Sequence, residues 1–451
     1  MLPAAFEPFL QDAPFCVMAR ATLEALFHPP RLDALFQRTA QKGYTRTLHF
    51  SQLVHLMTAV VLRQQPSVLA AYHKRVGAIS VSDQAVYNKL DRVELDVSAA
   101  LVQDSAQYVA PVLDQLQARQ PAWLAGYRTR VLDGNHLSAT ERRLLPLRDA
   151  WDAPLPGKVL AVLEPESGLA VDVFLTPDGH AQERSLLGSV LASVRERDLW
   201  IADRNFCTLQ FLCELHRAKA AFVIRQHGQL AGTLLGERRY VGTSDTGRVY
   251  EQRIELTYQG RRRQFRRVTV ELFQPTRDGD TQIHILTNLP KKKAKALVVA
   301  ELYRRRWSIE GLFLEVSQTL NAEPQTLAYP KAALFAFCLA LLASNAVAVL
   351  KAALRAEHGA EAADELSAYY AALDIQQVHR GMMIALPAPQ WEWLRELDAA
   401  GLAAVLRQMA HYIDPKRYRK APRKPKKPPV PKAYRNGGHV STHKVLQGRQ
   451  T

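Results

Sequence analysis

The chain has 451 residues, enough for two to four domains at roughly 100–200 residues each. Apolar residues make up 47% and charged residues 23%, which fits a globular protein and excludes a disordered or fibrous chain. The formal net charge of +16 indicates an anionic partner such as nucleic acid. Residues 415–451 contain twelve basic side chains and no acidic ones, so most of the excess charge lies there and the rest is nearly neutral.

Cysteine usage and the apolar segments bear on the compartment. The four cysteines are too scattered for a disulfide framework or a zinc site, which favours a reducing compartment. The first residues lack the pattern of a signal peptide. Residues 332–350 carry no charge and are long enough to span a bilayer, but they are alanine-rich and include Ser344 and Asn345. We expect a buried core helix there and no membrane partner.

Residues 1–120 are predicted to be helical. Residues 50–63 have helical periodicity, and Ser67 and Ser82 each stand where a serine would cap a following short helix. Gly77 separates these two short helices. They form either a helix-turn-helix that enters a DNA groove or a small helical subdomain that packs on its neighbour, and both interpretations stay open.

From residue 127 the pattern changes to strands that alternate with helices. Strands are predicted at 127–132, 158–163, 169–176, 199–202 and 221–225, and helices at 181–195 and 209–219. Three consecutive strands followed by this alternation predict the α/β class, with a mixed sheet flanked by helices.

The segment that follows breaks this alternation. Residues 226–288 predict an antiparallel β insertion with an arginine-rich turn at 260–267, and Pro290 with the lysines after it is expected to begin a helix reaching about residue 320. The predicted division is an all-α N-terminal DNA-binding domain (1–120), a catalytic core in two parts (121–225 and 290–356), a β-rich insertion (226–289), a C-terminal helical region (357–414) and a basic disordered tail (415–451).

Two aspartates follow predicted strands. Asp133 comes after the strand ending in RVL, and Asp203 comes after WIA. Ligand sites in open α/β sheets gather at the carboxyl ends of strands, so neighbouring strands would bring these carboxylates together. Paired carboxylates suit Mg²⁺ or Mn²⁺. For each aspartate taken alone, a turn residue or helix cap is the favoured interpretation, and the spacing does not establish that the strands are neighbours.

A third acidic residue lies on the predicted helix that ends near residue 320. At 100° per residue, Tyr303 and Arg306 share a face with Glu310. This face could offer one metal ligand and two groups that contact phosphate. The alternative is an Arg306–Glu310 ion pair on a solvated face, which periodicity alone favours.

Taken together, these residues resemble a known family. The series Tyr303-x2-Arg306-Trp307-x2-Glu310, preceded by VLDGN at 131–135 and IADRNF at 201–206, resembles the cut-and-paste insertion-sequence transposases of the DDE class with a Y-R-E-K signature. The likeness covers most of the chain. It implies a ribonuclease-H-like core whose strands one and four lie side by side.

The resemblance also implies roles for individual residues. Asp133, Asp203 and Glu310 would be the catalytic triad and the metal ligands, Tyr303 and Arg306 would hold DNA phosphates, and Trp307 would lie beside the active site. Two Mg²⁺ ions, replaceable by Mn²⁺ and roughly 3.5–4 Å apart, would serve phosphodiester hydrolysis and then strand transfer by the freed 3′ end. A hairpin intermediate is a further implication.

The sequence departs from the family pattern in two places. The family lysine falls on Ser317, so a phosphate contact is lost or comes from elsewhere. Relatives can stack a flipped base on a tryptophan of the insertion, but residues 225–290 contain none, which leaves Tyr240, Tyr250 or Tyr258. Residues near the aspartates in sequence are weaker candidates for supporting roles: Asn135, His136 and Arg204.

The implied partners are double-stranded DNA, as terminal inverted repeats and as target, and a second copy of the chain in a homodimer. The implied location is the cytoplasm of a prokaryote, at the nucleoid. Basic stretches that could neutralise phosphates are the tail, Arg261, Arg262, Arg263, Lys291, Lys292 and Lys293. Two other functions stay open: a non-catalytic DNA-binding regulator derived from a transposase, and a metal-dependent nuclease without strand transfer.

Overall fold

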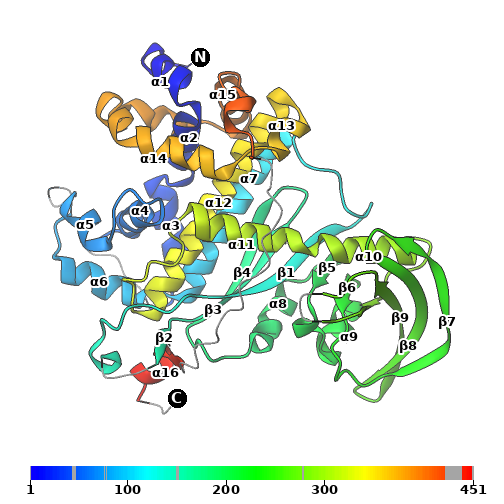
Figure 1. Ribbon diagram of the computed structural model, residues 1–451. Coiled ribbons are helices and arrows are strands. Elements are labelled where there is room, and N and C mark those ends of the chain that lie inside the picture. The colour runs from blue at the N-terminus through cyan, green and yellow to red at the C-terminus, as the bar shows by residue number, and fades with distance from the viewer. Residues whose placement is uncertain are drawn as a thin grey trace.

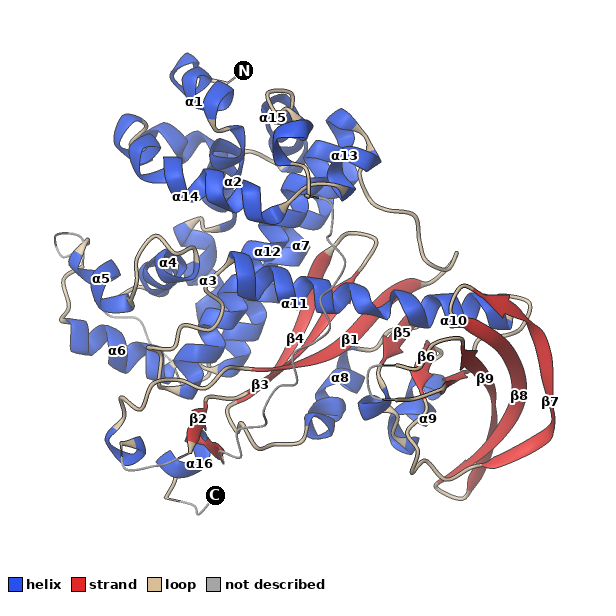
Figure 2. Ribbon diagram, in the orientation of Figure 1, coloured by secondary structure: helices blue, strands red, loops and turns tan. Residues whose placement is uncertain are grey.

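The computed structural model describes residues 2–42, 47–75, 77, 79–148, 152–276, 279–421 and 439–448 (Figure 1). Figure 2 shows helices gathered on one side of the molecule and a large sheet extending to the other. The helices up to residue 115 confirm the predicted helical segment: α1 (Glu7–Asp12), α2 (Pro14–Leu26), α3 (Pro29–Thr39), α4 (Phe50–Val61), α5 (Val68–His73), α6 (Asp83–Arg92) and α7 (Leu95–Gln115).

The two predicted helix caps are confirmed. Ser67 Oγ accepts a hydrogen bond from the N–H of Ala70, and Ser82 Oγ accepts one from Ala85. Each serine therefore satisfies a backbone donor that the first turn of its helix leaves free.

Nine strands of the described chain form one mixed sheet, in the order β4-β3-β1-β5-β6-β10-β9-β8-β7, which confirms the α/β prediction. β1 runs parallel to β5, and β5 runs parallel to β6, while the other neighbouring pairs are antiparallel. The helices α8 (Leu187–Ser193) and α9 (Leu209–Arg217) connect strands of the core. The strands are β1 (Arg128–His136), β3 (Lys158–Glu164), β4 (Leu169–Thr176), β5 (Asp198–Ala202), β6 (Ala221–Arg225), β7 (Thr233–Ser244), β8 (Gly247–Tyr258), β9 (Arg261–Leu272) and β10 (Gln282–Thr287).

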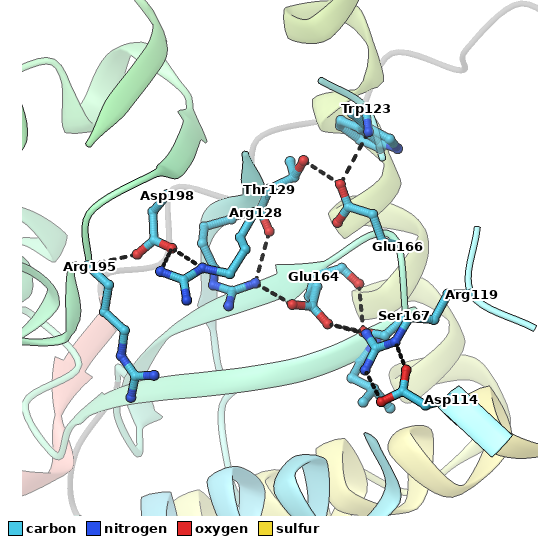
Figure 3. Close-up of polar contacts among 12 residues, drawn as sticks. Asp114, Arg119, Trp123, Arg128, Thr129, Glu164, Glu166, Ser167, Arg195 and Asp198 are labelled. Carbon is cyan, nitrogen blue, oxygen red and sulfur yellow. Dashed lines mark hydrogen bonds and ion pairs between the residues drawn. The ribbon is translucent and has the colours of Figure 1, made fainter. Parts of the chain in front are cut away.

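A hydrogen-bonded network fixes the beginning of β1 (Figure 3). Arg128 Nε donates to Asp198 Oδ1 of β5 at 3.0 Å. On the other side of β1, Thr129 Oγ1 donates to Glu166 at 2.5 Å, and Arg130 donates to Glu164 at 2.7 Å. The network therefore ties β1 to both of its neighbours and supports the register in which Leu132 pairs with Ala202.

The β insertion continues the core sheet, because β10 pairs with both β6 and β9. Sequence analysis did not predict β7, whose register is interrupted between Leu235 and Arg239 and again between Tyr240 and Gly242. These bulges disturb the alternation by which a strand is recognised. The predicted arginine-rich turn is wrong, since Gln259 and Gly260, both with positive φ, form the turn and the arginines begin β9.

The predicted single helix from residue 290 to 320 is also wrong in detail. Lys291–Lys293 lie in a turn, α10 (Ala296–Arg304) starts later, and a 3-10 turn, η6 (Arg305–Trp307), separates it from α11 (Ser308–Thr319). Apolar side chains of these two helices are buried, with Leu302, Ile309 and Val316 no more than 2% exposed. Figure 1 shows α10 and α11 lying across the sheet.

The apolar segment forms the long helix α12 (Pro330–His358), which packs against α2, α4, α7 and β4. It is long and apolar enough to cross a membrane, but 89% of its most apolar 18-residue stretch is buried inside the protein, which confirms the predicted core helix. Its Asn345 amide accepts a hydrogen bond from Ala170 N (2.8 Å) and donates to Ala170 O (3.0 Å) and Ser105 Oγ (2.9 Å). A helix side chain thus completes the backbone hydrogen bonds of the outer strand β4 at this residue.

The C-terminal helices α13 (Ala360–Asp364), α14 (Ala368–Ala385) and α15 (Ala399–Ala410) follow, and α14 and α15 pack on the N-terminal helix α2. After them, β11 (His439–Ser441) pairs with β2 (Ala153–Leu155) and leads into α16 (Thr442–Leu446). The predicted disordered tail is therefore wrong for 415–421 and 439–448, which have defined structure, while 422–438 and 449–451 lie outside the described residues.

Candidate active site

The two aspartates lie side by side because of the sheet register. Parallel pairing pairs Leu132 with Ala202 and ends there, so Asp133 and Asp203 are the next residues on adjacent strands. Side chains alternate between the faces of a strand, so both carboxylates project from the same face. β1 itself continues past Asp133 to His136 in antiparallel pairing with β3, so the prediction that this strand ends before Asp133 is wrong.

The α10–η6–α11 segment brings the other predicted residues onto these aspartates. Tyr303 Oη donates to Asp203 Oδ1 at 3.0 Å. Arg306 donates from Nη1 to Asp133 Oδ2 at 2.5 Å and from Nη2 to Glu310 Oε1 at 3.1 Å. These hydrogen bonds form two groups, which meet where the Arg306 guanidinium lies 6.0 Å from the ring centroid of Tyr303, and the five residues together make up one cluster. The alternative, an Arg306–Glu310 ion pair, is present and its Glu310 side is 45% exposed, but Arg306 is only 6% exposed and also reaches Asp133, so the pair is part of the site and not an isolated surface contact.

Burial controls the protonation of this cluster. It raises the pKa of Asp133 to about 6, with further upward contributions from Asp203 and Glu310, against the opposing effect of Arg306. Burial and the adjacent Asp203 raise the pKa of Tyr303 far above its usual range, so Tyr303 remains a neutral donor. Burial disfavours the charge of Arg306, but its carboxylate neighbours, Asp133 first, raise its pKa overall.

The donor chemistry of the cluster suits a hard divalent cation, because Asp133, Asp203 and Glu310 offer carboxylate oxygens. In the conformation of the structure, the described parts of the chain contain no group of three His, Cys, Asp or Glu residues placed so that they could hold a metal ion. Arg306 pairs with Asp133 and with Glu310, and Glu310 is 45% exposed at its side chain. A cation held by all three carboxylates therefore requires Glu310 to turn toward the aspartates.

The remaining predicted DNA-contacting residues lie outside the hydrogen-bonded cluster. Trp307 is 63% exposed, and Arg306 lies 5.8 Å from its ring centroid. The three arginines at the start of β9 are exposed, and two of them line a 270 Å³ pocket with residues of α9. The three lysines before α10 are exposed as well, with Lys291 3.6 Å from Glu251. These groups are Arg261, Arg262, Arg263, Lys291, Lys292 and Lys293.

Three residues near the aspartates in sequence have partners elsewhere. Asn135 Nδ2 donates to Glu323 at 3.1 Å, His136 lies 3.8 Å from Glu183, and Arg204 lies 3.7 Å from Asp280. Each of these partners is a carboxylate other than Asp133, Asp203 and Glu310.

The departures from the family pattern are also located. Ser317 is exposed on α11, and its hydroxyl donates to the backbone of its own helix. Arg63 of the N-terminal helices lines the same 420 Å³ pocket as Ser317. Of the candidate tyrosines, Tyr240 and Tyr250 face each other across β7 and β8 with ring centroids 5.6 Å apart, and Tyr240 is 58% exposed.

Sequence reasoning missed Arg225. Ala202 pairs with Ile224, so Arg225 follows on β6 in register with the two aspartates, and its charge acts on Tyr303 and Asp203. Its guanidinium is held by Asp280 at 2.6 Å. The signal was present in the sequence, because the strand AFVIR ends in a charged residue just as RVLD and WIAD do.

Comparison with known proteins now adds to this geometry. Residues 124–346, which contain the whole cluster, match the family model described as the transposase DDE domain. A curated protein of Sinorhizobium fredii (strain NBRC 101917 / NGR234), "Putative transposase y4zB", is 29% identical over 199 residues, covering 40% of this chain. The chain spans 53% of that relative's length. The family model and the curated relative to which the chain is similar are thus both transposases, and the family model is of the DDE class.

The cryo-EM structure of a piggyBac transposase synaptic complex with hairpin DNA matches with a TM-score of 0.38 and 12% identity, covering 86% of this chain and 84% of that chain.

Proposed function

We propose that the protein is a DNA transposase that binds transposon ends, cleaves them and joins the 3′ ends to target DNA. The observation that carries the proposal is the cluster in which Asp133 and Asp203 lie in register on adjacent strands and Tyr303, Arg306 and Glu310 reach them from one helical segment. Its position inside the segment that matches the transposase DDE domain supports the same function.

Asp133, Asp203 and Glu310 are the proposed catalytic and metal-binding residues. A transposase DDE domain generally implies divalent metal use, and bound Mg²⁺ or Mn²⁺, as two ions, would supply Lewis-acid activation of the phosphodiester and of the attacking oxygen. The protein's own part is to hold the carboxylates: Tyr303 orients Asp203, and Arg306 holds Asp133 and Glu310.

Arg306 also has the geometry of a phosphate-binding group. It is a buried guanidinium whose Nε has no hydrogen-bond partner among the described residues. When Glu310 turns toward the aspartates, Nη2 is released, and Arg306 then offers donors to a phosphate. Tyr303 and Arg225 both lie near Asp203, so we add Arg225 of β6 to the proposed phosphate-binding groups of the Y-R-E-K signature. The lysine position of that signature is Ser317.

The proposed fold of the core is ribonuclease-H-like, supported by the order β4-β3-β1-β5-β6 and by the parallel pairing of the strands that lead to the aspartates. The proposed DNA partners are inverted repeats and target DNA, bound by a homodimer in the prokaryotic cytoplasm. The exposed arginines of β9 and the lysines before α10 support contacts with phosphates.

The decisive experiment incubates the purified chain with the DNA that flanks its gene, with Mg²⁺ or with EDTA. We expect Asp133→Asn, Asp203→Asn and Glu310→Gln each to lose Mg²⁺-dependent cleavage while gel-shift binding persists. Glu315→Gln is the matched control, because Glu315 lies on the same helix and pairs with Lys351 at 2.6 Å. Full cleavage by any of the three variants contradicts the site.

The same assay separates the two other functions. Ends that are cut and joined to target DNA indicate transposition, and ends that are cut without joining indicate a metal-dependent nuclease. Binding without cutting, in Mg²⁺ and in Mn²⁺, indicates a regulator derived from a transposase. Arg306 contacts both Asp133 and Glu310, two of the three proposed metal ligands, and this is the observation that favours testing for a regulator.

A further inference from the structure

A second group of polar contacts lies behind the Asp133–Asp203 pair, on the opposite face of the sheet. Val131 belongs to the core cluster that α10 and α11 help to build, whereas Leu132 belongs to the cluster built with α8 and α9. Because side chains alternate along a strand, Asp133 projects toward α10 and α11, and position 134 faces α8 and α9. The space next to Gly134 is therefore on the far side of β1 from the carboxylates.

Glu183 of the short 3-10 helix η4 (Glu183–Leu186) fills that space. A Cβ on Gly134 would lie 2.6 Å from Cδ of Glu183 and 3.1 Å from its Oε2, so a larger residue fits there only if the Glu183 carboxylate moves. Gly134 is not among the glycines with positive φ, and other residues can adopt its backbone conformation. What requires a glycine at this position is the room that Glu183 occupies.

The same helix holds the turn that follows Asp203. Glu183 Oε2 accepts a hydrogen bond from Asn205 Nδ2, and Arg184 Nε donates to Asn205 O at 2.7 Å. Asn205 is the middle residue of the 3-10 turn η5 (Arg204–Phe206), which begins directly after Asp203. Two successive residues of η4 therefore fix both the side chain and the backbone of this turn.

The placement of the Glu183 carboxylate is not explained by an ion pair. Its side chain is only 12% exposed, and no lysine or arginine in the described parts of the chain pairs with it. His136 Nδ1 is 3.8 Å away, which is beyond hydrogen-bond distance. Enclosing a carboxylate without a positive partner costs free energy. Its close contacts are instead with Gly134 and Asn205, in the two segments that carry the aspartates.

We propose that Glu183 is a positioning residue for the Asp133–Asp203 pair, an inference that rests on the proposed function. By occupying the space behind Gly134 and holding Asn205, Glu183 fixes the spacing at which the two aspartates offer their oxygens to a divalent cation. Groups that orient metal ligands in this way commonly change metal affinity by about 10–100-fold when they are removed. Glu183 itself touches neither the cation nor DNA in this role.

The test is calorimetric titration of the full chain with Mn²⁺, without DNA, so that cleavage is not measured. We expect the parent chain to bind Mn²⁺ and Asp203→Asn to lose this binding, which assigns the signal to the site. Glu183→Ala should weaken Mn²⁺ binding by about tenfold or more. Glu183→Gln should weaken it by less than about threefold, because an amide oxygen fills the same space and still accepts from Asn205. The matched control is Glu251→Ala, which should leave Mn²⁺ binding unchanged, since Glu251 is 15% exposed and pairs with Arg266 in the β insertion.

Gly134→Ala tests the same contact from the other side. Its Cβ should displace the Glu183 carboxylate and weaken Mn²⁺ binding by about tenfold. In the Glu183→Ala background the space is open, so adding Gly134→Ala should weaken binding by less than about a further twofold. Two unrelated disturbances of the fold would instead add their effects in the double variant.

The outcomes separate this inference from the proposed function. A parent chain that does not bind Mn²⁺, or Asp203→Asn binding as tightly as the parent, contradicts the proposed metal site and this inference with it. If Asp203→Asn loses binding and Glu183→Ala retains it, the metal site stands and the role of Glu183 is overturned. Fully additive losses from Gly134→Ala and Glu183→Ala also overturn that role.

Discussion

At the scale of single residues, Arg306 links the more buried part of the site, at Asp133, to its more exposed part, at Glu310. It is buried and contacts Asp133, whose side chain is 19% exposed, and Glu310, whose side chain is 45% exposed. The same guanidinium therefore takes part in one sheltered ion pair and one solvated ion pair. Water screens the second pair much more than the first.

Replacing Arg306 should therefore cost far more stability than replacing its exposed partner. We expect Arg306→Met to lower the free energy of unfolding by about 3 kcal/mol, because it leaves Asp133 buried without a counter-charge. Glu310→Gln should change it by less than about 1 kcal/mol. Urea unfolding of both variants at pH 7 checks this, and equal losses would show that the two contacts are equally sheltered.

The residues of the site could be predicted from sequence only in part. Asp133, Asp203 and Glu310 could be named as candidates, and their spacing on strands and helix was readable. Their contacts could not be predicted, because the register of β1 against β5 depends on pairing between residues that lie 70 positions apart in the chain. Arg225 escaped for the same reason, since only the sheet places it beside Asp203.

At the scale of elements, strong local patterns predicted well and interrupted ones did not. β3, β5 and β6 were correct within a residue or so because buried apolar runs define them, and serine caps marked α5 and α6. β7 was missed because two bulges break its alternation. The 3-10 turn at Arg305–Trp307 was not visible either, since its residues also fit a continuous helix.

The network at the start of β1 offers a test of how register is held (Figure 3). Asp198 is buried at 3% side-chain exposure, and it accepts hydrogen bonds from Arg128 Nε and from Arg195 N. We expect Asp198→Ala to lower the free energy of unfolding by about 1–2 kcal/mol, because the hydrogen bonds that Arg128 and Arg195 donate to this buried carboxylate are lost.

Asp114 provides the matched control in the same network. Its side chain is 57% exposed and pairs with Arg119, so Asp114→Ala should cost less than about 0.5 kcal/mol. Denaturant titration of the two variants decides the matter. Comparable losses for Asp114→Ala and Asp198→Ala would mean that the register of β1 does not depend on the buried part of the network.

At the scale of the whole molecule, acid sensitivity is built into three elements. Burial and neighbouring arginines lower the pKa of His55 on α4, His284 on β10 and His379 on α14 to about 4 each. In the unfolded chain these histidines become protonated near pH 6.5, whereas in the folded chain they stay neutral down to about pH 4. Their neutral state therefore contributes its full stabilisation above pH 6.5, and the free energy of unfolding falls as the pH drops from 6.5 toward 4.

Between pH 7 and pH 5, each of these histidines should cost about 1–2 kcal/mol of unfolding free energy. The check is urea unfolding at the two pH values for the parent chain and for His284→Gln. The parent should lose about 1–2 kcal/mol more than the variant over this interval. An identical loss in both would contradict the lowered pKa of His284 and leave the acid sensitivity to other groups.

The amide of Asn345 has a consequence for how the sheet can grow. Among the described strands, β4 and β7 are the two borders, and at β4 a helix side chain occupies the hydrogen-bonding positions of Ala170 that an added strand would need. In the described part of the chain, β7 accepts a side-chain hydrogen bond at Gly236 O from Gln252 of its neighbour β8 but none from a helix, and its Leu234 is 47% exposed. Unpaired borders are where chains recruit foreign strands. An added strand would therefore pair with β7 and not with β4, and strand exchange between molecules would start from β7.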